Sequence, residues 1–125
     1  MISEFKDIVA KHAITLKDSF SSDGTFCLNK KSCEHFIKRY CERVDTDFAM
    51  FDIFMDKIVK AIVLNERRLR ASVSNANIGV SIEQTVFVGK YSVHLLLHRG
   101  QPCISDDLGQ NIIVTLATIM NRTRY

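Results

Sequence analysis

The stretch Thr46–Ala71, TDFAMFDIFMDKIVKAIVLNERRLRA, constrains the fold more than any other part of the chain. Up to about Leu64 its apolar residues cover most of the circumference of a helix, and only a narrow strip of charged residues interrupts them. A helix of this kind has to be covered on more than one side. The sequence therefore predicts a central core helix that continues into an exposed basic tip containing Arg67, Arg68 and Arg70.

Two amphipathic helices are expected before this stretch. Apolar residues recur at steps of three and four over Ile2–Phe20, which indicates the first helix. The second is expected to begin at a cap formed by Ser32 and to reach Val44. Between them, Phe26–Leu28 is interpreted as a short strand or an anchored loop.

After the basic tip, the apolar pattern changes to a period of two, which indicates β-strands. The pair Gly89-Lys90 suits a two-residue type II′ turn. We therefore expect an antiparallel hairpin with strands at about 78–88 and 91–99. Its register places most of the apolar residues on one buried face and leaves the opposite face mixed.

The last segment favours a helix from Ser105 to about Asn121, because Ser105 can cap it and two aspartates follow in its first turn. Apolar residues at helical spacing would line its inner face. The segment is also rich in β-branched residues, so a strand within 106–121 is the alternative.

Together these elements predict an α+β fold, with four helices around a central long hydrophobic helix and the antiparallel hairpin packed on the helices. The chain has 125 residues, of which 46% are hydrophobic and 25% charged, and it contains no Pro-, Gly- or Ser-rich linker. This composition is typical of an ordered globular protein. We therefore expect residues 1–125 to form a single globular domain.

Nothing in the chain indicates membrane insertion or secretion. The start, MISEFKDIVAKHA, carries spaced charges unlike those of a signal peptide. The uncharged run Ile112–Met120 is far shorter than the ~20 residues of a membrane span. The four cysteines form neither CxxC pairs nor a small secreted framework. We expect no membrane span, metal or cofactor, and an intracellular, cytoplasmic protein with reduced cysteines.

Three residues are weak candidates for catalysis: Cys103, His94 and His98. Cys103 precedes the expected last helix, where a helix dipole activates a thiol. The two histidines share one face of their strand, with Glu83 diagonal to both. The alternative is an ordinary polar outer face. No Walker, GxGxxG, GxSxG or HExxH motif is present, so the sequence favours a non-enzymatic protein over an enzyme.

The cluster of Arg67, Arg68 and Arg70 is the candidate site for phosphate or nucleic acid, because grouped arginines match phosphate oxygens. The net charge is only +3, which is less basic than is usual for a nucleic-acid domain. Arginines at the end of a helix also complement its dipole without binding a ligand. Nucleic-acid binding is therefore the second hypothesis.

The leading hypothesis is a non-enzymatic protein–protein interaction module, such as an adaptor, a chaperone or an assembly subunit. The chain has a surplus of apolar residues, which includes Phe87 and Leu96 on the outer hairpin face. The open edge of a hairpin can also pair with another chain. We expect a protein partner or a homodimer. The alternative interpretation of the surplus is a well-filled core.

Overall fold

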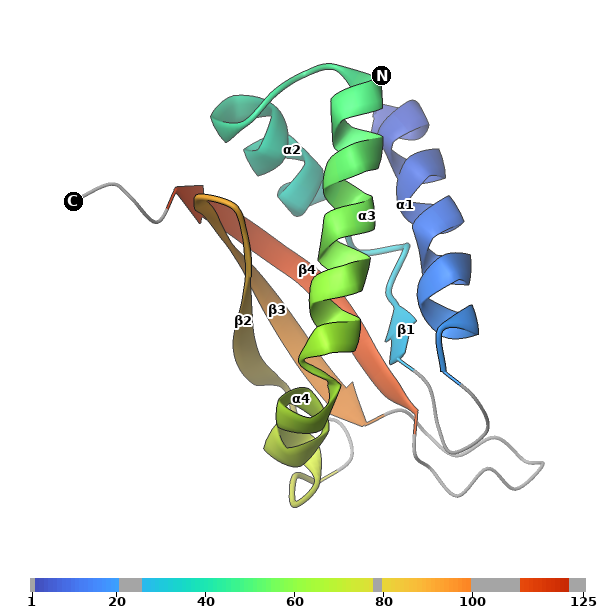
Figure 1. Ribbon diagram of the computed structural model, residues 1–125, viewed down its shortest axis with the longest axis vertical. Coiled ribbons are helices and arrows are strands. Elements are labelled where there is room, and N and C mark those ends of the chain that lie inside the picture. Colours follow the sequence, from blue (N-terminus) through green and yellow to red (C-terminus); the bar gives the residue numbers. More distant parts are fainter. Residues whose placement is uncertain (1, 21–25, 78–79, 100–110, 122–125) are drawn as a thin grey trace.

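The computed structural model describes residues 2–20, 26–77, 80–99 and 111–121. These residues form four helices and four strands, which confirms the predicted α+β class. In chain order, the elements in Figure 1 are α1 (Ile2–Asp18), β1 (Phe26–Leu28), α2 (Glu34–Arg43), α3 (Phe48–Leu64), α4 (Glu66–Val73), β2 (Ile82–Val88), β3 (Tyr91–Arg99) and β4 (Ile112–Asn121).

The four strands form one sheet in the order β1-β4-β3-β2, in which β1 is parallel to β4 and the other neighbours are antiparallel. The predicted hairpin register is confirmed, because Val88 pairs with Tyr91 and Ile82 with Leu97. Gly89 in the turn has a φ of 59°, the left-handed conformation that a two-residue hairpin turn requires. β2 is shorter than expected, since it begins at Ile82 rather than near residue 78.

The predicted last helix is wrong over its described part, because Ile112–Asn121 is strand β4. Buried and half-exposed residues alternate from Ile112 to Leu116, as they do in a strand with one buried face. β-branched side chains pack well on such a pleated surface. β4 pairs with β3 on the side away from β2, so the hairpin is not an isolated ribbon with two open edges. The expected cap at Ser105 lies outside the described residues.

The stretch 46–71 divides after Leu64, as expected, but the part that follows is a separate helix rather than an exposed tip. The division lies at Asn65, whose side-chain amide donates to the carbonyl of Ala61 at 2.7 Å. Such a local side-chain bond competes with the next helical turn. α4 turns away from the axis of α3 (Figure 1), and its Leu69 and Val73 are buried.

The starts of α2 and α3 are capped differently. Ser32 does not cap α2, because the helix begins at Glu34 and the N-cap position is Cys33, without a side-chain bond. α3 has a polar cap, because the carboxylate of Asp47 accepts the backbone N–H of Met50 at 3.1 Å. This bond satisfies one of the free donors at the start of the helix.

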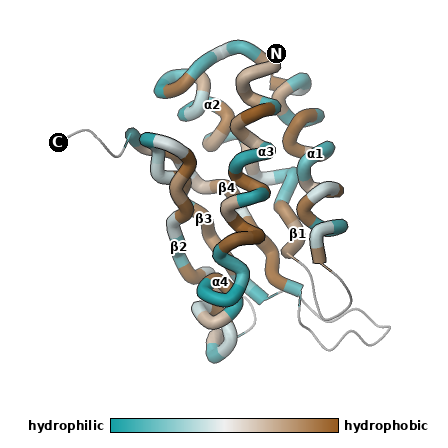
Figure 2. The backbone as a smooth tube through the Cα atoms, viewed as in Figure 1, coloured by the Kyte–Doolittle hydropathy of each residue, from teal (hydrophilic) through white to brown (hydrophobic). Residues whose placement is uncertain are grey.

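The helices pack on one face of the sheet, and the core lies between the two layers. Figure 2 shows hydrophobic residues along both α3 and β4. The ring of Phe51 on α3 lies 4.9 Å from that of Phe5 on α1 and 4.8 Å from that of Tyr40 on α2, measured between centroids. These edge-to-face contacts join three helices. Among the helices of the described residues, none is long and apolar enough to span a membrane.

Candidate interaction surface

The sheet has a second face that no described helix covers. The register points alternate residues of each strand away from the helical layer. We call this the outer face, and it consists of Cys27, Glu83, Thr85, Phe87, Ser92, His94, Leu96, His98, Ile113, Thr115, Thr118 and Met120. Except for Ser92, all of these residues are at least partly exposed. The set contains one carboxylate and no lysine or arginine, so the outer face carries little charge.

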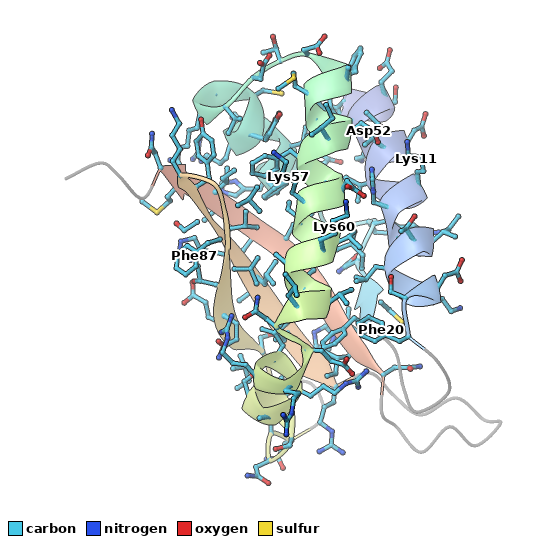
Figure 3. All side chains as sticks on the ribbon, viewed as in Figure 1. Lys11, Phe20, Asp52, Lys57, Lys60 and Phe87 are labelled. Atoms are coloured by element: carbon cyan, nitrogen blue, oxygen red, sulfur yellow. The ribbon has the colours of Figure 1, made fainter. Side chains whose placement is uncertain are left out.

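The largest apolar side chains of the outer face lie in one row across three strands. Phe87 on β2 and Met120 on β4 flank Ser92 of β3. Phe87 is 55% exposed and Met120 is 49% exposed. Figure 3 shows Phe87 pointing away from α3. Leu96 lies on the same face, about 13 Å from Ser92 along β3. Both residues predicted for an interaction surface, Phe87 and Leu96, therefore lie on the outer face.

The members of this face on β4 could not be placed from the sequence. Ile113 and Met120 lie in the segment for which the sequence favours a helix. In the structure both residues belong to β4 and are on its outer side. The β-branched content of the segment was the signal that could have placed them there.

The two candidate catalytic histidines, His94 and His98, lie on the outer face with Glu83. The Nδ1 atom of His94 is 3.5 Å from Oε2 of Glu83 and 3.4 Å from Oγ1 of Thr85. Both distances are long for hydrogen bonds, so these partners hold the ring only loosely. Cys103 is outside the described residues, and catalysis by this set stays a prediction. Within the described ranges, no group of three His, Cys, Asp or Glu could hold a metal ion.

The free edge of β2 is partly occupied by Arg68 of α4. Its guanidinium donates to the side-chain oxygen of Gln84 at 2.7 Å and to the backbone oxygen of Thr85 at 3.0 Å. In an antiparallel hairpin, alternate residues direct their backbone groups outward, where a further strand would pair. Arg68 therefore binds one of the acceptors that pairing along this edge would use.

The three arginines of the predicted anion site have different surroundings. Besides Arg68, which binds β2, Arg70 bonds the carboxylate of Glu66 at 2.7 Å and lies 4.8 Å from the ring centroid of Phe26. Arg67 is exposed and makes no hydrogen bond or ion pair with other described residues. Two of the three guanidinium groups are thus engaged within the molecule. Anion binding by the cluster stays a prediction.

The helical layer contains a polar cluster between α1 and α3. The Nε2 atom of the buried His12 lies 2.7 Å from Oδ1 of Asp52, and the ammonium group of Lys11 lies 2.8 Å from the same oxygen. Figure 3 shows Lys11 and Asp52 close together between the two helices. The hydrogen bonds from Lys11 and then from His12 lower the pKa of the Asp52 carboxyl. The cluster therefore ties the two helices together.

Two of the described cysteines, Cys33 and Cys41, are free thiols. Burial raises the pKa of the Cys33 and Cys41 thiols. A thiol with a raised pKa is a poor nucleophile, because the thiolate is the reactive form. Cys33 and Cys41 therefore behave as packing residues.

No known protein family, curated protein or solved structure matches this chain. Function therefore has to be inferred from the surfaces of the described residues. The outer face combines exposed apolar side chains with little charge. These two properties are typical of the central part of protein interfaces.

Proposed function

We propose that this chain is a non-enzymatic protein–protein interaction module, of the adaptor, chaperone or assembly-subunit kind, whose outer face binds a second copy of the chain. The observation that carries the proposal is a sheet face on which Phe87 and Met120 stand half exposed in one row with little charge around them. Removing apolar surface from water contributes about 25 cal/mol per Å². Covering this face would therefore favour association.

A second copy fits the outer face in both chemistry and symmetry. Contacts between identical chains are most often two-fold, so that one patch meets itself. The outer face has a single acid, Glu83, and no lysine or arginine, so two copies would bring little like charge together. Two sheets that stack in this way lie about 10 Å apart and interdigitate their side chains.

The size of the outer face predicts a weak dimer. From Ser92 to His98 it extends about 20 Å along β3, and four strands cover about 14 Å, so the footprint is about 300 Å² without overhanging side chains. Stable interfaces bury about 800 Å² on each partner. Interfaces well below this size belong to the weak, transient class, so we expect a reversible dimer.

The edge of β2 supports docking less well than the outer face does. Arg68 already binds the backbone oxygen of Thr85, so an added strand would first have to displace the guanidinium. Binding at the outer face requires no such rearrangement.

An intracellular, cytoplasmic location with reduced cysteines is part of the proposal. Cys33 and Cys41 are free thiols, and free thiols persist in reducing compartments.

Sedimentation analysis over a wide range of protein concentrations tests the proposal. We expect the average mass of the wild-type chain to rise toward that of a dimer. Phe87→Lys/Met120→Lys places two charges on the outer face and should remain monomeric at every concentration. The matched control is Leu64→Lys, because Leu64 is an apolar residue of α3 that is 84% exposed. The control should associate as the wild type does.

Circular dichroism checks that all variants are folded. A wild-type chain that stays monomeric throughout would refute self-association, even if the outer face binds a different protein. Dimerisation of Phe87→Lys/Met120→Lys as strong as that of the wild type would show that the outer face is not the interface.

A further inference from the structure

A pocket lies on the helical side of the sheet, at the end where β2 turns into β3. Its volume is about 330 Å³, and its walls come from the end of α2 with the connection to α3, from α3 itself, and from the β2–β3 turn. This volume is at the small end of the ~300–1,000 Å³ range of small-molecule sites. The inner layer, not the outer face, forms the pocket.

The floor of the pocket is aromatic and apolar. Tyr40, Phe54 and Val88 line it, and all three belong to the buried core. The ring of Phe54 is held between Tyr40 and Tyr91, at centroid distances of 5.2 Å and 5.9 Å. Side chains packed in this way cannot move independently, so the floor is preformed.

One wall of the pocket leaves apolar surface in contact with water. Met50 and Ile53 line the pocket from the first half of α3, and each is about half exposed. They are three residues apart and therefore lie next to each other on the helix surface. An apolar molecule in the pocket would cover both.

Two ammonium groups also line the pocket, Lys57 from α3 and Lys90 from the turn. Neither forms an ion pair with a described residue. Lys60, about one turn further along α3, is bound to Asp56 at 2.9 Å, and it does not line the pocket. Figure 3 shows Lys57 on the side of α3 toward the β2–β3 turn. The pocket therefore has two cations without an acidic partner among the described residues.

The other groups around these cations keep the pocket positive. The ammonium nitrogen of Lys90 lies 5.6 Å from the ring centroid of Tyr91, a contact that holds it beside the pocket. Asp45 is the carboxylate among the lining residues, and its Oδ1 accepts the backbone N–H of Asp47 at 2.9 Å. Two cations and one acid leave a net charge of +1 at the pocket.

We infer that this pocket binds a small apolar anion, meaning a molecule with an aromatic or aliphatic body and one carboxylate or sulfonate group. The body lies against Phe54, Met50 and Ile53, and the anionic group lies between Lys57 and Lys90. Ammonium groups donate strong, charge-assisted hydrogen bonds to such oxygens. The site is independent of self-association, because it is on the opposite side of the sheet from the outer face.

Two fluorescent probes test the inference on the whole chain. Anilinonaphthalene sulfonate has an aromatic body and one sulfonate, and phenylnaphthylamine has the same kind of body without the charge. We expect saturable binding of both. Lys57→Gln/Lys90→Gln should lower the affinity for the anionic probe about three- to tenfold, because each exposed ion pair contributes little. The affinity for the neutral probe should not change. The matched control Lys60→Gln should change neither affinity.

Two further variants and amide chemical shifts locate the probes. Ile53→Asp puts a charge in the pocket wall and should lower the affinity for both probes. Phe87→Lys on the outer face should lower the affinity for neither. The largest shifts on titration should occur at the amides of Ile53 and Gly89. The inference is overturned if the anionic probe does not saturate, if Lys57→Gln/Lys90→Gln binds it as the wild type does, or if the shifts centre on the outer face.

Discussion

The bond between His12 and Asp52 provides a quantitative test of how α1 is held to α3. His12 is 5% exposed, and its Nε2 lies 2.7 Å from Oδ1 of Asp52. An ionised carboxylate only accepts hydrogen bonds, so we assign the proton to Nε2. Nδ1 is then a buried nitrogen without a hydrogen-bond partner. Removing the carboxylate would leave neither ring nitrogen with a partner.

We expect Asp52→Ala to lower the free energy of unfolding by about 1–3 kcal/mol, the usual cost of an unsatisfied buried polar group. The side chain of Asp52 is 39% exposed, so water can replace part of the lost bond and the lower half of this range is expected. The matched control is Lys11→Ala. The Lys11 side chain is 61% exposed, and we expect its loss to cost less than about 0.5 kcal/mol.

The double variant His12→Leu/Asp52→Ala should be more stable than Asp52→Ala alone. Replacing both partners by apolar side chains removes the unsatisfied ring nitrogens, and such replacements are often nearly neutral. The resulting double-mutant cycle should give a coupling of about 1–2 kcal/mol between His12 and Asp52.

Urea unfolding followed by circular dichroism measures these differences. For an m-value of about 1–3 kcal/mol/M, a loss of about 1.5 kcal/mol shifts the midpoint by about 0.5–1.5 M. If Asp52→Ala stays within about 0.5 kcal/mol of the wild type, or if the double variant is less stable than both single variants, the bond does not hold His12 as reasoned.

The bond between His12 and Asp52 also predicts how the stability of the fold depends on acidic pH. Because the folded chain lowers the pKa of Asp52, its ionised form contributes stability above the unfolded pKa of about 3.9, and this stability is lost as the pH falls through the folded pKa. Unfolding free energies measured from neutral to acidic pH should therefore fall less steeply for Asp52→Ala than for the wild type.

Three further variants test other parts of the structure. Arg70→Ala removes an ion pair and a contact with aromatic rings, and urea unfolding should show a loss of about 1–2 kcal/mol, whereas Arg67→Ala should stay within about 0.5 kcal/mol. Gly89→Ala should cost about 1–2 kcal/mol in thermal unfolding, because a φ of 59° is unfavourable for a residue with a Cβ. Burial raises the pKa of Tyr40 to about 12, so stability should be complete below the unfolded pKa of about 10 and should fall as the pH rises toward 12, a loss that Tyr40→Phe should reduce.

The hairpin was predictable because two independent local signals agree there. The period of two assigns a face to each residue, and Gly89 can take the positive φ of the turn. Together they determine the register, and the register places Phe87 and Leu96 on one face. The exposure of that face depends on which elements cover it, and the local sequence does not contain this information.

β4 was mistaken for a helix because an irregularity in the strand imitates helical spacing. His94 pairs with Thr118 and Leu95 with Leu116, so Ala117 is an extra residue in β4. Such a bulge shifts the alternation by one position. Ile112, Val114 and Leu116 are buried at the strand period of two, and the bulge then places the buried Ile119 three residues after Leu116. Ile112, Leu116 and Ile119 therefore stand four and three apart. The same spacing is the signature of an amphipathic helix.

The role of Arg68 could not be predicted from the sequence. Its partners Gln84 and Thr85 are 16 and 17 residues away, and the bond forms only because α4 turns away from the axis of α3 at Asn65. The residues after Asn65 are good helix formers, so propensity alone favours one continuous helix. Tertiary packing of Leu69 and Val73 outweighs this preference.

The β2 edge of the sheet and its outer face differ in how they could bind another chain. An open edge can pair with almost any extended chain, because backbone groups do the binding and register is weakly specified. A face binds through side chains, so its partner must fit the positions of residues such as Phe87 and Met120. Arg68 occupies an acceptor on the β2 edge, whereas no described element covers the outer face. This difference is the reason why we propose association through the outer face in one defined geometry, rather than strand addition at the β2 edge.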